Sequence, residues 1–164
     1  MEATQAQLRG IVQPFPVVLY PDAELVAITW HRERLGDAVG MVCSELPEPD
    51  EFNGLLPIVQ FVRLPSPPAD RRVHDIARLQ CIVRVDEATG RPGAIDLAGY
   101  VSAHFAAMSG QTITLPPTTY TPGGAATVGC VRGQSNPAPF RDDNTNIIGL
   151  AFTGELYLRP FRVT

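Results

Sequence analysis

Residues 75–85 constrain the fold most, because apolar and polar side chains alternate along them. Five apolar residues occupy every second position: Ala77, Leu79, Cys81, Val83 and Val85. The positions between them hold Arg78, Gln80 and Arg84, together with Ile76 and Ile82. Successive side chains of a strand point to opposite faces, so this pattern predicts a strand with one buried face.

A second alternating segment covers residues 147–159. Its apolar positions are Ile148, Leu150, Phe152, Leu156 and Leu158. Shorter strands are predicted at residues 38–44, 58–62 and 126–132. Because the apolar face of a sheet must be covered by another layer, we expect Leu79 and Phe152 to be buried on the side where helices pack.

Residues 22–35 have helical periodicity and could form part of that layer. Asp22 can cap the free N–H groups of the first turn, and Gly36 can end the helix in a left-handed conformation. The predicted apolar face comprises Leu25, Ile28, Thr29 and Leu35, widened by Val26 and Trp30. The opposite face holds Glu24, His31 and Arg34, so His31 is expected to be solvated.

A second helix is predicted from Pro92, a residue tolerated in a first turn, to Gly110. Asp96 suits the positive end of its dipole. An apolar stripe is formed by Leu97, Val101, Phe105 and Met108. A face of small residues, which permits close approach of another element, is formed by Gly99, Ser102, Ala103 and Ala106.

The predicted order is helix, three strands, helix, two strands, with short links that favour antiparallel neighbours. We therefore predict the α+β class, with a single mostly antiparallel or mixed β-sheet of four to five strands and two α-helices packed on one face. The 164 residues are expected to form a single domain. Residues 1–20 are interpreted as an N-terminal extension, and residues 111–146 as a Pro/Gly/Thr-rich loop region with one short strand.

The composition argues against several classes of protein. The net charge is −4, which does not favour binding to nucleic acid. All 13 basic residues are arginine, whose bidentate pairs suit interfaces. The first ten residues lack the pattern of a signal peptide, and no apolar run is long enough to span a membrane, so no membrane association is expected. Three cysteines without a CxxC spacing are interpreted as reduced thiols on strands: Cys43, Cys81 and Cys130.

No motif for catalysis, a cofactor or a metal emerges. His31, His74 and His104 are far apart and lack metal-ligand spacing, and His104 is expected to be partly buried and hydrogen-bonded. Residues 121–124 (Thr-Pro-Gly-Gly) are read as a turn, because the lysine and helix of a phosphate-binding loop are missing. Carboxylates gather in a proline-rich loop and in a later one, and are read as solvated: Glu45, Glu48, Asp50 and Glu51, then Asp142 and Asp143. Arg71 and Arg72 lie in a comparable exposed loop.

The chain is therefore predicted not to be an enzyme, with no catalytic, cofactor-binding or metal-binding residue. One alternative is a small soluble enzyme or ligand-binding domain whose site assembles from distant residues. Its first candidates are His74, Asp75 and Cys81, which lie on or near one strand. Residues 75 and 81 are six apart, so both project to the same face of that strand.

Several segments together resemble a known family. A helix begins at Pro21-Asp22-Ala23-Glu24, ends at Leu35-Gly36-Asp37 and leads into residues 42–47. Strand-like residues 56–63 (LPIVQFVR) and 77–85 (ARLQCIVRV) follow, then a helix and a final strand ending Tyr157-Leu158-Arg159. This order resembles the tail terminator proteins of actinobacterial siphophages across most of residues 21–160. The first twenty residues and the segment 111–146 are longer than in that pattern.

The resemblance implies a structural virion protein that acts by binding. It implies a homo-oligomer, a hexameric ring at the head-proximal end of the tail tube, which stops tube polymerisation and provides the surface for head–tail joining. The implied partners are the tail tube protein on one face and a head–tail connector or stopper protein on the other. Double-stranded DNA would pass through the lumen without specific binding. The implied location is the neck of the virion, after assembly in the host cytoplasm. Another neck protein, a connector or stopper, is the alternative within the virion.

Overall fold

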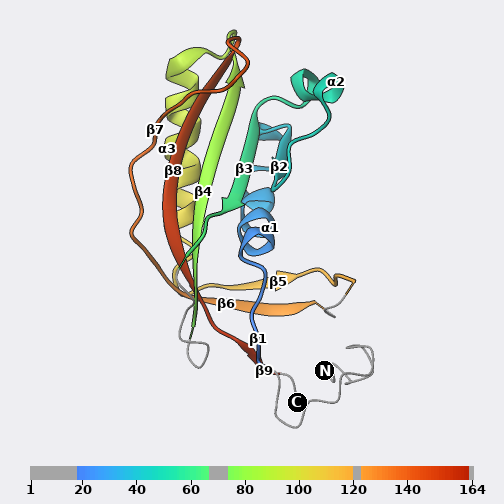
Figure 1. Cartoon of the computed structure of the whole chain (residues 1–164), viewed down its shortest axis with the longest axis vertical. Coiled ribbons are helices and arrows are strands. Elements are labelled where there is room, and N and C mark those ends of the chain that lie inside the picture. Colours follow the sequence, from blue (N-terminus) through green and yellow to red (C-terminus); the bar gives the residue numbers. More distant parts are fainter. Residues whose placement is uncertain (1–17, 67–73, 120–122, 163–164) are drawn as a thin grey trace.

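A computed structural model describes residues 18–66, 74–119 and 123–162 (Figure 1). The first half contains β1 (Val18–Leu19), α1 (Ala23–Leu35), β2 (Met41–Cys43), α2 (Pro49–Phe52), β3 (Ile58–Arg63) and β4 (Asp75–Asp86). The second half contains α3 (Gly90–Ala106), β5 (Thr112–Leu115), β6 (Gly124–Arg132), β7 (Ala138–Phe140), β8 (Ile147–Leu158) and β9 (Phe161–Arg162). Two 3-10 turns, Gly36–Ala38 and Asn53–Leu55, follow α1 and α2.

The main sheet has the strand order β2-β3-β4-β8-β6-β5, and β7 also pairs with β8. Only β2 and β3 are parallel; the other pairs are antiparallel. The long pair β4–β8 runs from Asp75 opposite Leu158 to Asp86 opposite Ile147. On its other side β8 contacts β7 near its beginning and β6 near its end. A separate two-stranded sheet joins β1 to β9.

The α+β class is confirmed, but the predicted count of four to five strands is too low. The segment 111–146, expected to contain one short strand, contributes β5, β6 and β7. The two strands that were not predicted, β5 and β7, have only four and three residues, and β7 includes Pro139. Proline cannot donate to a ladder and so suits a strand paired on one side only. The predicted loop after β2 also contains the short helix α2.

The helices α1 and α3 cover one face of the sheet and enclose the core. The predicted inward residues of β4 are all buried, as are Leu150, Phe152, Leu156 and Leu158 of β8. Gly154 lies between Phe152 and Leu156 on the same face, and the ring of Phe105 from α3 occupies the space where a Cβ would stand. A glycine in this strand therefore admits a large side chain from the helix.

The buried face of α1 is rotated from the predicted one. Asp22 caps the helix as expected, with Oδ1 accepting from the N–H of Glu24 at 2.9 Å, and Gly36 ends it with φ of 49°. However, the prediction that His31 is solvated is wrong, because its side chain is fully buried. Leu25 and Thr29 are only partly buried, and the core face instead comprises Ala23, Val26, Ala27, Ile28, Trp30, His31 and Leu35.

The helix α3 buries Val101 and Phe105 as predicted, but Leu97 only partly, and Met108 is buried in the turn after the helix. Two alanines, Ala94 and Ala98, complete its buried face. The face of small residues points outward, because Gly99, Ala103 and Ala106 are all exposed. The close approach that small residues allow is therefore made at Ala94 and Ala98.

Truncation of the core at Leu79 or Phe152 is expected to be strongly destabilising. Both side chains are buried between the sheet and the helices, so Leu79→Ala or Phe152→Ala should lower the free energy of unfolding by about 2–5 kcal/mol. Denaturant titration measures this, with Ile95→Ala on the exposed side of α3 as the control. A loss at Leu79 or Phe152 as small as that of the control would contradict the assigned core.

Candidate functional site

The three candidates for an enzyme site are not brought together. Cys81 is buried in the core beneath the helices, and burial raises the pKa of its thiol well above the usual value. Asp75 lies six residues away along β4, roughly 20 Å at the rise of a strand. Its carboxylate accepts two hydrogen bonds from Nη2 of Arg63, at 2.8 and 2.9 Å. His74 lies edge-on to Tyr157. These residues cannot act on one substrate atom.

The other histidines also have packing roles. The ring of His31 lies against Phe61 and Phe105, with centroid distances of 4.6 and 6.4 Å. His104 is partly buried as predicted, but it is not fully hydrogen-bonded, since its Nε2 has no partner among the described residues. Nowhere in residues 18–66, 74–119 and 123–162 do three or more His, Cys, Asp or Glu side chains converge as metal ligands would.

The cysteines and the remaining motifs are placed only in part. Cys43, Cys81 and Cys130 lie on β2, β4 and β6 as free thiols, as predicted. Arg71, Arg72 and the first part of the 121–124 turn lie outside the described residues. No helix within the described ranges has both the length and the apolar character that crossing a membrane requires.

The second carboxylate pair divides into two different environments. Asp143 is exposed, as predicted for a solvated loop, but Asp142 is not. Its Oδ2 accepts a hydrogen bond of 2.7 Å from Nε of Arg84, whose side chain is only 5% exposed. The alternation of β4 places Arg84 on the face away from the helices, but it does not reveal that this arginine is buried.

Arg84 on β4 contacts both the neighbouring strand β3 and the segment between β7 and β8. Its Nη1 donates to Oε1 of Gln60 on β3 at 2.8 Å, and Nε2 of Gln60 donates to the carbonyl of Ser44 at 2.9 Å. The guanidinium also lies 5.5 Å from the centre of the Phe140 ring. We call residues 133–146 the strap, since they run from the end of β6 along the β8 side of the sheet to the start of β8 (Figure 1).

Electrostatics stabilise the ionised form of Asp142. Partial burial opposes ionisation, but the hydrogen bond from Arg84, the N–H of Asn144 at 3.0 Å and the nearby positive charge together lower the pKa of the carboxyl.

The strap is also fixed at its first residues, where Nε2 of Gln134 donates to the carbonyl of Ser102 on α3 at 2.7 Å. Close approach of Phe140 is possible because Gly149 has no side chain: a Cβ there would lie 2.8 Å from the Phe140 carbonyl oxygen.

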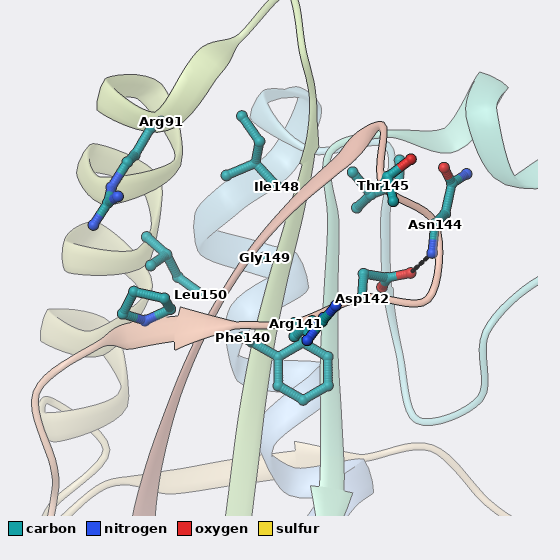
Figure 2. A pocket seen from close by; sticks show the side chains of 11 residues that line it. Arg91, Phe140, Arg141, Asp142, Asn144, Thr145, Ile148, Gly149 and Leu150 are labelled. Atoms are coloured by element: carbon teal, nitrogen blue, oxygen red, sulfur yellow. Dashed lines mark hydrogen bonds between the residues drawn. The ribbon is translucent and has the colours of Figure 1, made fainter.

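A pocket of about 380 Å³ opens beside this strap, where β7 forms the edge of the sheet against the start of β8. We call it the β8-edge pocket. Figure 2 shows Arg91 of α3 on one side, Asn144 and Thr145 of the strap on the other, and Ile148 between them. Its apolar lining comes from Pro139, Phe140, Ile147, Ile148 and Leu150.

The charged lining of the pocket is positive. Arg91 and Arg141 are exposed, and neither forms an ion pair within the described part of the chain. Asp142, the acidic lining residue, is already paired with Arg84. The lining contains no histidine, cysteine or lysine that could act as base or nucleophile. Apolar contacts together with two unpaired guanidinium groups suit the binding of an acidic group.

Sequence reasoning did not find this pocket. Arg91 and Arg141 are fifty residues apart, and no local pattern distinguishes them from the other arginines. Comparison with models of protein families finds no match to this chain, and comparison with curated proteins finds none either.

Proposed function

We propose that the chain is a tail terminator, a structural protein that forms a ring on the head-proximal end of a phage tail tube and acts without catalysis. The observation that carries the proposal is the order of elements: α1, the β3–β4 antiparallel pair, α3 and the long strand β8. The same order, with the residues of strands 56–63 and 77–85, carries the resemblance to the tail terminators of siphophages.

Three further features support a binding role. The β8-edge pocket presents two exposed arginines beside apolar groups. The edge strands β2 and β5 each have one partner among the described strands, and edge strands can pair with another protein. A net charge of −4 suits a lumen through which DNA passes without being held.

Purified protein is expected to form a closed oligomer and to stop the growth of tail tubes. Sedimentation gives the mass of the oligomer, and electron microscopy of polymerising tube protein with and without the chain gives the distribution of tube lengths. Tubes should be shorter and capped at one end when the chain is present. A protein that remains strictly monomeric and never caps tubes would contradict the proposal, and labelling that places it against the portal would instead favour a connector or stopper.

A further inference from the structure

The two oppositely charged surfaces of the chain lie near different strands of the main sheet. The acidic segment (residues 45–51) follows the edge strand β2, and its four carboxylates are exposed: Glu45, Glu48, Asp50 and Glu51. The β8-edge pocket lies beyond β3, β4 and β8, roughly 14 Å away at three strand spacings. Figure 1 shows α2 at the upper right and α3 with β7 at the upper left, at a similar height.

The acidic segment complements the pocket in charge and in apolar surface. None of its four carboxylates forms an ion pair within the described ranges, and Leu46 beside them is 41% exposed, one of few large apolar side chains so open to solvent. The pocket has an apolar lining and two unpaired guanidinium groups, Arg91 and Arg141. Prolines at 47 and 49 restrict the backbone of the segment, which lowers the entropy lost when it binds.

From this complementarity we infer that the β8-edge pocket binds the acidic segment of a second copy of this chain. Leu46 enters the apolar part of the pocket, and the carboxylates of Glu48 and Asp50 pair with Arg91 and Arg141. Because the donor and acceptor surfaces are different patches of the subunit, the contact is head-to-tail, and its repetition gives a ring when the rotation per subunit closes on itself. This inference rests on the proposed function for the ring, and it names the contact that builds it.

The absence of lysine from the sequence allows a direct test. A zero-length carbodiimide joins an amine to a carboxylate, so Arg91→Lys and Arg141→Lys each introduce a single reactive side chain while keeping the positive charge. In an equal mixture of ¹⁴N- and ¹⁵N-labelled protein, mixed-isotope peptides identify links between subunits. We expect such links to Glu48, Asp50 or Glu51. The control is Arg159→Lys, an exposed position just after the end of β8, which should give none to this segment.

Charge reversal provides a second measurement. The variants Arg91→Glu/Arg141→Glu and Glu48→Arg/Asp50→Arg should each lose self-association, by more than about a hundredfold in dissociation constant, because like charges then face each other. An equal mixture of the two should regain it, since each reversed surface then meets its complement. Circular dichroism checks that both variants are folded, as expected for changes at exposed positions.

The outcomes separate this contact from the ring itself. If the unmodified protein assembles or caps tubes, and the reversed variants do so equally well or the mixed-isotope links fall elsewhere, the pocket is not the contact and the proposed ring still stands. If the unmodified protein is monomeric alone but caps tubes, the same crosslinking is done on capped tubes. Links to the acidic segment then support the contact, and links elsewhere overturn it. A monomer that never caps tubes overturns both.

Discussion

Asp142→Asn is expected to lower the free energy of unfolding by about 3 kcal/mol, because it leaves the charge of Arg84 buried without a partner. The side chain of Arg84 is 5% exposed and that of Asp142 is 15% exposed, so water cannot replace the lost carboxylate easily. The amide of asparagine could still accept a hydrogen bond, but it would not compensate the positive charge. Denaturant titration at neutral pH measures the loss.

The neighbouring residue supplies a matched control for this experiment. Asp143→Asn makes the same chemical change at an exposed position, and should alter stability by less than about 0.5 kcal/mol. The double variant Arg84→Met/Asp142→Asn should lose less stability than the single variants Arg84→Met and Asp142→Asn lose when added together. The reason is that the double variant leaves no unpaired buried charge. Equal losses for Asp142→Asn and Asp143→Asn would show that the ion pair does not hold the strap.

The unmodified protein is expected to lose about 3 kcal/mol of stability through His31 alone as the pH falls from 6.5 to 4. Burial lowers the pKa of His31 from 6.5 to about 4, and outweighs the two carbonyl oxygens near its ring nitrogens. Those oxygens belong to Ala27, 2.8 Å from Nδ1, and Val101, 3.3 Å from Nε2. The shorter distance favours the neutral tautomer with its proton on Nδ1.

The direction of this pH dependence follows from how many protons the folded chain and the unfolded chain bind at His31. Above pH 6.5 the imidazole is neutral in both, so it contributes no pH dependence. Between pH 6.5 and 4 the unfolded chain binds a proton that the folded chain does not, and folding becomes less favourable. Below pH 4 both states are protonated and this contribution is constant.

Comparison with His31→Gln isolates this effect from the titration of carboxylates. The difference in stability between the unmodified protein and the variant should shrink as the pH falls from 7 to 5. Parallel stability curves for the unmodified protein and His31→Gln over this range would contradict the buried neutral state.

Local patterns were sufficient to predict the elements that pack the core. The alternation in residues 75–85 and 147–159 identified β4, β8 and their buried faces, because a strand's side chains follow a period of two wherever the strand lies. The cap at Asp22 and the end at Gly36 were predicted for the same reason: each depends on a few neighbouring residues. The strands β5 and β7 were missed because four and three residues are too few to show a period.

Only the tertiary structure decided which polar side chains are buried and which surfaces face each other. The helical period places His31 on the polar face with Glu24 and Arg34, which predicts solvent exposure, yet Phe61 and Phe105 from other elements cover it. Arg84 and Asp142 are 58 residues apart in the sequence and meet only because the strap crosses the sheet. The sequence alone determined the main helices and strands, because their periods span only a few residues. The Arg84–Asp142 ion pair that fixes the strap, and the β8-edge pocket, depend on contacts between distant segments, which no local period encodes.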